Sequence, residues 1–204
     1  MIEILTVCTG NVCRSALAAV VLRGRLADLG ARVSSAGSGA LVGDPLTPQT
    51  AQIALAAGAR QDDVEAHRAR YLAEGIAAQA DLLLAMTRDH RSAAVELSPA
   101  LLRRAFTARE FARLAEGMTD ADIAQAAVGP DPQRRLRAAL RVLANRRGIV
   151  GPAEDPAWDD VIDPYRQSDE VYQQQARQLL PALDQVERFV RVAVRPHNLT
   201  GVSS

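Results

Sequence analysis

The residues with the clearest chemical potential stand near the N-terminus, in the segment Cys8-Thr9-Gly10-Asn11-Val12-Cys13-Arg14-Ser15. A thiol opens this segment, and a guanidinium and a hydroxyl close it. An apolar run, residues 2–7, precedes it, and an Ala/Leu-rich run, residues 16–29, follows it. This order predicts a strand, a tight loop and a helix.

A loop of this kind can bind an oxyanion. The first N–H groups of a helix have no intrahelical acceptor and lie at the positive end of the helix dipole, which favours a phosphate-like group. Gly10 would allow a positive φ or a close approach of the backbone. Arg14 adds a planar, two-pronged donor for the oxygens of the anion.

The same surroundings favour Cys8 as a thiolate nucleophile, with Ser15 donating its hydroxyl to the sulfur. The predicted reaction is attack on phosphorus, formation of a phosphocysteine and its hydrolysis. No metal or other cofactor is needed, because the N–H groups and Arg14 supply the positive charge. The alternative is that Cys8 is a small buried apolar residue at a strand end. That alternative leaves the spacing to Arg14 and Ser15 unexplained.

Together with Val7, this segment resembles the signature of the low-molecular-weight protein tyrosine phosphatases. The family usually has Pro after the Ser, where this chain has Ala16, a residue well tolerated early in a helix. The resemblance covers residues 1–116 and 159–192. It implies hydrolysis of phosphotyrosine in proteins. Bacterial relatives oppose tyrosine kinases, often those of polysaccharide export, so such a kinase is a candidate partner.

A second motif, Asp163-Pro164-Tyr165, matches the acid loop of that family. Attack by a thiolate expels an oxyanion that needs a proton, which a carboxylic acid can supply. Pro164 restricts Asp163 to extended conformations and so keeps it out of a helix. Asp-Pro is also a common turn, and three rival carboxylates stand nearby: Asp155, Asp159 and Asp160.

Two cleft walls and a supporting network also follow from the resemblance. Tyr165 would form one wall of the substrate cleft, and Leu41 would stand where relatives often carry an aromatic residue. Four residues match those that hold the loop in the family: Asn11, Ser15, Ser35 and His67. His67 could instead be a surface helix residue, and His90 has no comparable support.

Cys13 has two interpretations. It can be a packed residue of the loop. It can also trap oxidised Cys8 as a disulfide and so protect it from irreversible oxidation, as the resemblance implies.

Composition narrows the class of protein. Of 204 residues, 24 are basic and 24 acidic, so no net field recruits nucleic acid or a membrane. No apolar run approaches the length of a membrane span, and the first one is too short for a signal peptide. Two closely spaced cysteines exclude a secreted disulfide scaffold, which predicts a cytoplasmic protein. The oligomeric state stays open.

Strands alternate with helices along the first 116 residues. Apolar strands are predicted at residues 2–7 and 81–86, a short strand at 32–35 and a weaker one at 101–106, which Arg103 and Arg104 interrupt. Helices are predicted at 16–29, after Thr47, after Thr87 and after Thr107. This alternation predicts a three-layer α/β fold with a central four-stranded parallel sheet, of the flavodoxin-like type. The loop at 8–15 should then lie at the carboxyl edge of the sheet, where such folds bind ligands.

Residues 117–158 interrupt this pattern. Helices are predicted to begin at Thr119 and Asp131, the second reaching about Arg147, and compact relatives lack this stretch. We therefore expect one phosphatase domain, residues 1–194, with a helical insertion at about 117–158, a closing helix at about 169–194 and a flexible tail at 195–204. The insertion carries Arg134, Arg137 and Arg141 on one face, which is either solvated or directed at an acidic partner.

Two rival functions remain. Arsenate reductases share this fold and loop, and one coupled to a small thiol would need no further cysteine. Such an enzyme would not explain Asp163-Pro164-Tyr165. A non-catalytic oxyanion-binding module predicts the loss of Cys8 or Arg14, and both are present. The sequence therefore favours a cysteine-dependent phosphatase.

Overall fold

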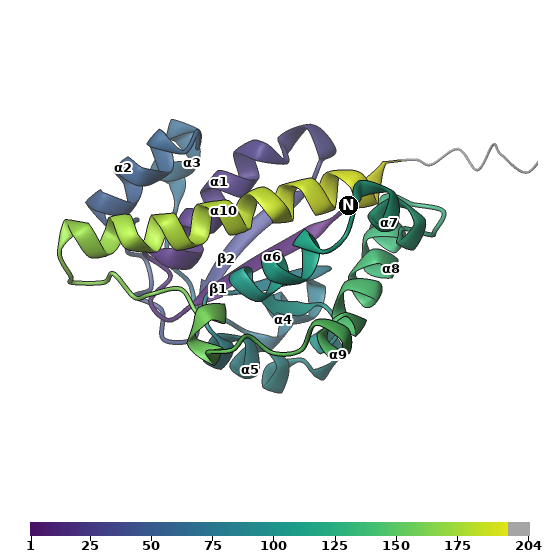
Figure 1. The fold of residues 1–204 in the computed structure, drawn as a ribbon. Helices are drawn as coiled ribbons and strands as arrows, with labels where there is room; N and C mark the ends of the chain where they lie inside the picture. The colour runs from purple at the N-terminus through teal and green to yellow at the C-terminus, as the bar shows by residue number, and fades with distance from the viewer. Residues whose placement is uncertain (196–204) are drawn as a thin grey trace, which may run out of the picture.

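The computed structural model describes residues 1–195 and shows an α/β fold around one parallel sheet (Figure 1). The strands lie in the order β2-β1-β3-β4, and every neighbouring pair is parallel. Their bounds are β1 Glu3–Cys8, β2 Arg32–Gly37, β3 Leu82–Ala85 and β4 Ala105–Thr107. The predicted four-stranded, flavodoxin-like sheet is thus confirmed. The predicted tail lies outside the described residues except for Arg195.

Ten α-helices are present in the described part of the chain. They are α1 Arg14–Arg25, α2 Pro48–Ala56, α3 Gln61–Ala66, α4 Glu74–Gln79, α5 Arg88–Leu97, α6 Ala108–Glu116, α7 Asp120–Ala126, α8 Pro132–Asn145, α9 Arg147–Val150 and α10 Asp169–Val194. Three short 3-10 turns accompany them: Ala27–Leu29, Pro99–Leu101 and Pro156–Asp159. None of the helices between residues 1 and 195 is long and apolar enough to cross a membrane.

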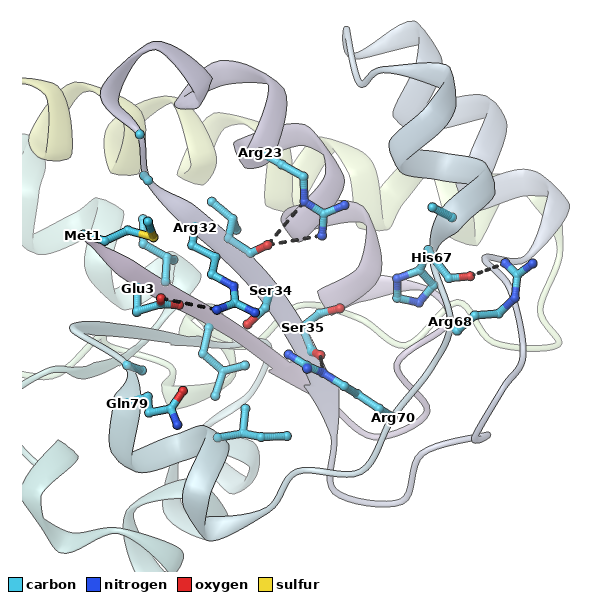
Figure 2. A pocket seen from close by; sticks show the side chains of 18 residues that line it. Met1, Glu3, Arg23, Arg32, Ser34, Ser35, His67, Arg68, Arg70 and Gln79 are labelled. Carbon is cyan, nitrogen blue, oxygen red and sulfur yellow. Dashed lines mark hydrogen bonds and ion pairs between the residues drawn. The ribbon is translucent and has the colours of Figure 1, made fainter.

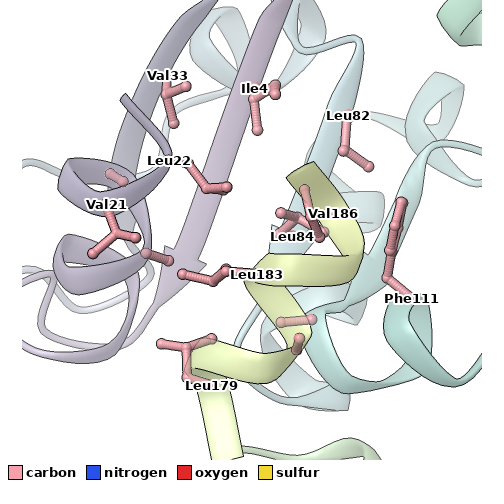
Figure 3. Packing of buried hydrophobic residues seen from close by; sticks show 14 of the residues in the cluster. Ile4, Val21, Leu22, Val33, Leu82, Leu84, Phe111, Leu179, Leu183 and Val186 are labelled. Carbon is pink, nitrogen blue, oxygen red and sulfur yellow. The ribbon is translucent and has the colours of Figure 1, made fainter. Parts of the chain in front are cut away.

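Helices cover both faces of the sheet because β1 alternates its side chains between two cores. Ile4 belongs to the larger core, under α1, α6 and α10. Leu5 and Val7 belong to the smaller core, under α4 and α5. Figure 3 shows Leu183 and Val186 of α10 packed near the strands of the larger core. The central strands β1 and β3 are therefore buried on both sides, which explains their largely apolar sequences.

Several predicted helix boundaries are confirmed by their caps. The side chains of Thr87, Thr107, Thr119 and Asp131 each accept a hydrogen bond from the backbone N–H three residues later. Thr107 and Thr119 form full capping boxes. These local signals placed α5 to α8 correctly because a cap acts within a single turn.

Three predicted boundaries were wrong. The strand expected at 101–106 contains only Ala105–Thr107, because Leu101 ends a 3-10 turn and Arg104 donates its N–H back to the Leu101 carbonyl. The first helix ends at Arg25, and a 3-10 turn occupies Ala27–Leu29 before Gly30. The helix expected to stop before Gly148 ends at Asn145, and a short helix, α9, contains that glycine.

The helical stretch at 117–158 is tied to the sheet at a buried carboxylate, Asp81, and also through Arg147, which donates to the carbonyl of Ala105 in β4 at 2.8 Å. Asp81 is fully buried at the start of β3 and accepts hydrogen bonds from the Glu3 N–H at 2.9 Å and from Gln133 at 3.0 Å. Arg137 pairs with the same carboxylate at 2.6 Å. Arg137 is therefore an internal anchor for α8 and not part of a free basic face.

Candidate active site

The loop between β1 and α1 lies at the carboxyl edge of the sheet, as predicted. Cys8 ends β1, and Cys13 occupies the N-cap position of α1. Within residues 1–195, the N–H groups of Gly10, Val12 and Cys13 have no hydrogen-bond acceptor. Free N–H donors around one loop are what an oxyanion requires.

The conformational demand falls on a different residue from the one expected. Asn11, not Gly10, adopts the left-handed conformation, with φ of 59°. A Cβ on Gly10 would meet only ordinary contacts, the nearest at 3.6 Å. Close approach instead occurs at Gly37, at the end of β2, where a Cβ would lie 2.2 Å from the carbonyl oxygen of Thr9. The glycine that this loop requires thus comes from a neighbouring strand.

The thiol of Cys8 is buried among donors. Its sulfur lies 2.9 Å from Ser15 Oγ, and the Asn11 N–H donates to it at 3.3 Å. The side-chain amide of Asn11 donates to Ser15 Oγ at 3.0 Å. Because that amide occupies an acceptor site of the hydroxyl, the Ser15 proton can point at the sulfur, which is closer than the rival acceptor, the Ala36 carbonyl at 3.5 Å. This arrangement stabilises a thiolate.

Asn11 is held by a second layer of contacts. Its Oδ1 accepts the N–H of Arg70 at 3.0 Å, and its carbonyl lies 2.8 Å from Nε2 of His67. A carbonyl can only accept, so Nε2 carries the proton. Burial, opposed by this hydrogen bond, lowers the pKa of His67 and keeps the ring neutral.

Ser35 does not support the loop as expected. It is buried in β2, but its hydroxyl has no hydrogen-bond partner within residues 1–195. Only its carbonyl is used, which accepts from Arg70 Nε at 2.9 Å. Within residues 1–195, Ser35 therefore contacts the supporting segment through its backbone carbonyl and not through its hydroxyl.

Asp163 reaches the loop from the far end of the chain. Its Oδ2 lies 2.7 Å from Arg14 Nη2, and 52% of its side chain is exposed. Arg14 is buried and also donates to the carbonyl of Val161 at 3.3 Å. The Tyr165 N–H donates to Asp163 Oδ1 at 3.2 Å, which orients the carboxylate.

The rival carboxylates are engaged elsewhere. Asp159 pairs with Arg113 at 2.9 Å, and Asp160 pairs with Arg88 at 3.0 Å. Asp155 accepts the N–H of Ala157 at 2.8 Å, within its own turn. Of the four, Asp163 is the one that lines the cavity over the loop.

That cavity has a volume of about 220 Å³. Cys8, Arg14 and Asp163 line it, with the loop residues Thr9, Gly10, Val12 and Cys13 and the wall residues Gly39, Leu41 and Tyr165. Leu41 and Tyr165 are thus both brought to the site. The guanidinium of Arg166 lies 5.1 Å from the centre of the Tyr165 ring, a cation–π distance.

His90 is a site-adjacent residue that the sequence did not single out. Its Nε2 lies 2.8 Å from Thr9 Oγ1, and its Nδ1 lies 2.8 Å from Thr87 Oγ1. Burial, and then the charge of Arg14, lower the pKa of His90 to about 4. In the sequence His90 stands three residues after the cap Thr87. This spacing indicates only an ordinary helix cap and gives no sign of a place beside the catalytic loop.

Both cysteines are free thiols. Cys13 directs its sulfur to Thr47 Oγ1 at 3.6 Å and to the Tyr172 hydroxyl at 3.8 Å. Burial raises the pKa of Cys13, so it is a neutral thiol at neutral pH. Thr47 faces Cys13 and Thr50 instead of capping α2 with its side chain.

Comparison with known proteins agrees with this geometry. The sequence profile of the family described as low molecular weight phosphotyrosine protein phosphatase matches residues 3–141. This chain belongs to that family. A probable low molecular weight protein-tyrosine-phosphatase of this family, EpsP from Ralstonia nicotianae, is 42% identical over 83 residues, which is 41% of this chain and 54% of the relative. The chain thus spans about half the length of that relative.

Two further known proteins match over more of their length. A protein-arginine-phosphatase from Geobacillus stearothermophilus is 34% identical over 145 residues, which covers 71% of this chain and 92% of the relative. The crystal structure of a low molecular weight protein tyrosine phosphatase from T. tengcongensis superposes with a TM-score of 0.61 at 27% identity. That superposition covers 91% of this chain and 97% of the other.

Proposed function

We propose that this protein hydrolyses phosphotyrosine in proteins, and aryl phosphates, through a phosphocysteine intermediate. One observation carries the proposal. A buried thiol with a hydroxyl at 2.9 Å shares a 220 Å³ cavity with Arg14, which is paired with Asp163 at 2.7 Å. The nucleophile, the hydrogen-bond donor for the phosphate and the acid thus line one small cavity.

In the first step, the phosphoryl group binds the free N–H groups of the loop and Arg14. Cys8 attacks phosphorus, a sulfur–phosphorus bond forms, and the bond from phosphorus to the leaving oxygen breaks. Protonated Asp163 gives its proton to that oxygen. Because Asp163 is half-exposed at the mouth of the cavity, it can reach the leaving group there.

In the second step, water attacks the phosphocysteine. The Asp163 carboxylate takes the proton of the water, phosphate is released, and Cys8 leaves as a thiolate. Ser15 and the Asn11 N–H stabilise this thiolate through the contacts already described. Asn11 and His67 position the loop and take no part in bond making.

Phosphoarginine is a second candidate substrate, favoured by the match to 92% of the length of the protein-arginine-phosphatase. Its leaving group is a guanidine nitrogen. Cys8 would again attack phosphorus, and Asp163 would give its proton to that nitrogen. In this chain, one wall is the aromatic ring of Tyr165, which can stack on a phenyl ring. The opposite wall, Leu41, is apolar. The Tyr165 ring can stack on a guanidinium too, so it is the apolar wall at Leu41 that favours the phenyl ring of phosphotyrosine.

The test uses two peptides of one sequence, carrying phosphotyrosine or phosphoarginine, in buffer with a chelator. We expect kcat/KM to be higher for phosphotyrosine by about tenfold or more, a preference worth about 1.4 kcal/mol. A higher kcat/KM for the phosphoarginine peptide would show that phosphoarginine is the preferred substrate and would contradict the proposal. Thiol-dependent reduction of arsenate without hydrolysis of either peptide would favour the reductase alternative.

We further propose that the natural substrate is a phosphotyrosine protein in the cytoplasm, where thiols stay reduced, and that a tyrosine kinase of polysaccharide export is a candidate. Residues 1–194 would act as one domain with the insertion at 117–158. The contacts of α8 with Asp81 support this proposal, since they tie the insertion to the sheet.

Cys13 is proposed to protect the nucleophile. When a peroxide oxidises Cys8 to a sulfenic acid, the Cys13 thiol can condense with it, giving a disulfide and water. A dithiol reductant then restores both thiols. Because Cys13 is held by Thr47 and Tyr172 in the reduced state, its side chain must rotate away from them to react.

A further inference from the structure

A second cavity, of about 670 Å³, lies along the outer edge of β2 (Figure 2). β2 is the last strand of the sheet on this side, and among residues 1–195 its outer edge is bridged only at Gly37, by Tyr71, beyond the end of this cavity. None of the residues that line this cavity lines the catalytic one. The two cavities are therefore separate sites.

The lining of this edge cavity is strongly basic. Four arginines contribute to it, Arg23, Arg32, Arg68 and Arg70, against a single carboxylate, Glu3. Arg23 pairs with Asp63 at 2.9 Å, but Arg32 reaches Glu3 only at 3.8 Å. Within the described chain, Arg68 and Arg70 pair with no carboxylate at all. The cavity thus holds more cations than its own acids can neutralise.

Two of these guanidiniums are held in place by the edge of the strand. Arg23 Nε donates to the carbonyl of Val33 at 3.3 Å, and Arg70 Nε donates to the carbonyl of Ser35 at 2.9 Å. In Figure 2 the guanidinium of Arg32 points to Glu3, and that of Arg70 points to the carbonyl of Ser35. Partial burial, and then the charges of Arg32 and Arg23, lower the pKa of Arg70. Fixed like charges of this kind repel one another until an anion lies between them.

Besides the charged groups the lining is mixed: Ala31, Val33 and Ile76 are apolar, and Ser34, Ser35, His67 and Gln79 are polar. A volume of about 670 Å³ lies in the usual range for small-molecule sites, on the order of 300–1,000 Å³. Guanidinium groups recognise phosphate oxygens through two parallel hydrogen bonds. We propose that this cavity binds a small organic phosphate, with its phosphate on Arg32 and Arg70 and its organic part against Ala31 and Ile76.

The edge cavity is connected to the catalytic loop by Arg70 itself. The side chain of Arg70 lies in the cavity, while its N–H donates to Asn11 Oδ1 at 3.0 Å. Asn11 in turn donates to Ser15 Oγ, which contacts the sulfur of Cys8. A ligand that fixes Arg70 therefore acts on the residue that holds the loop in its left-handed turn. This coupling rests on the proposed phosphatase function, whereas binding itself does not.

Binding is tested by NMR titration of the ¹⁵N-labelled Cys8→Ser protein, which does not turn over, with adenosine 5′-monophosphate. We expect shifts of the amide signals at residues 32–35 and 68–70, and none with adenosine alone. Arg32→Glu should weaken this binding about tenfold or more, because it reverses a charge at the phosphate. Arg103→Glu is the matched control, since it reverses an exposed arginine in a different groove and should change nothing.

Shifts confined to residues 8–15 would overturn the proposal, because the nucleotide would then occupy only the catalytic loop. Equal weakening by Arg32→Glu and Arg103→Glu would also overturn it, since that result indicates unspecific attraction. The coupling is tested separately with the wild-type enzyme and p-nitrophenyl phosphate. Adenosine 5′-monophosphate should change kcat in the wild type and not in Arg32→Glu, and an unchanged kcat in both would contradict the coupling alone.

Discussion

The two halves of the site are held together in different ways. The loop at 8–15 is a compact, buried unit in which Asn11 bonds the sulfur of Cys8 and the hydroxyl of Ser15 directly. Inside the acid segment at 159–165, the side-chain bond that the described residues show is the one from the Tyr165 N–H to Asp163 Oδ1. The segment is fixed by distant partners: Thr107 Oγ1 donates to the Asp159 carbonyl at 2.6 Å, and the Val161 N–H donates to the Met86 carbonyl at 2.8 Å.

This difference matches the two chemical tasks. The loop must present several donors to one phosphate, and a rigid local turn does this without reorganisation during the reaction. The acid must approach substrates of different size, and an exposed Asp163 on a segment anchored from α5 and α6 can do so. We therefore expect damage to the loop to abolish the reaction, and damage to the acid segment to slow it selectively.

The largest effect is expected for Cys8→Ser. Removal of the nucleophile should lower kcat by about 10⁴-fold or more, the scale seen when a nucleophile is lost from an enzyme. Binding of inorganic phosphate should persist, because the N–H groups and Arg14 remain. Steady-state kinetics and calorimetry measure the two quantities. Turnover near the wild-type level would exclude Cys8 as the nucleophile.

The next effect is expected for Asp163→Asn. Loss of the acid should lower kcat by about 10²–10⁴-fold on phenyl phosphate, a poor leaving group, and clearly less on p-nitrophenyl phosphate. Asp155→Asn is a matched control, since it alters the other Asp-Pro pair, which caps only its own turn. Equal losses on both substrates would argue against proton donation by Asp163.

A smaller effect is expected when the anchor of the acid segment is removed. Arg113→Met deletes the ion pair with Asp159 at 2.9 Å but leaves the loop untouched. We expect kcat on phenyl phosphate to fall about tenfold, in line with the cost of misplacing a catalytic group. The affinity for phosphate should be unchanged. A matching loss of phosphate affinity would show that the two halves are not independent.

The smallest effect concerns pH and His90, which lies beside the loop at Thr9. Because its pKa is lowered to about 4, the folded protein binds fewer protons than the unfolded chain between that value and the ordinary pKa of histidine, about 6.5. The free energy of unfolding should fall as the pH drops through this window, and the loss should be complete below it. Chemical denaturation at pH 7.5, 5.5 and 4 measures this loss.

A variant with Phe or Gln in place of His90 provides the comparison for this fall in stability, because neither side chain titrates. In His90→Gln the fall in stability over the same window should be smaller by about 1–3 kcal/mol, at about 1.4 kcal/mol per pKa unit. An identical fall in both proteins would show that other groups carry the acid sensitivity.

The same contrast explains what could be predicted from the sequence. The loop could be predicted because Cys8, Arg14 and Ser15 lie close together in the sequence. The caps Thr107 and Thr119 could be predicted for the same reason, since each bonds a residue three positions later. Asp163 was found only because its motif resembles that of a family. Nothing local separated it from Asp159 and Asp160, whose partners come from α6 and α5.

What the sequence could not show depended on contacts between distant strands. The close approach that requires Gly37 arises from the Thr9 carbonyl of the neighbouring strand end. The assignment of the left-handed turn to Gly10 followed residue preference, whereas Asn11 adopts it because His67 and Arg70 bind it there. The strand β4 was predicted, but its start was misplaced, because the sequence does not show that a 3-10 turn occupies Pro99–Leu101 before the strand begins at Ala105.

The most direct test of the account is capture of the phosphocysteine. The Asp163→Ala protein is mixed with p-nitrophenyl phosphate, quenched after milliseconds and digested, and the peptide that contains Cys8 is analysed by mass spectrometry. We predict a phosphate on Cys8, because p-nitrophenolate leaves without a proton while hydrolysis of the intermediate lacks its base. Release of p-nitrophenol with no phosphate on Cys8, or with phosphate on His90, would contradict the mechanism.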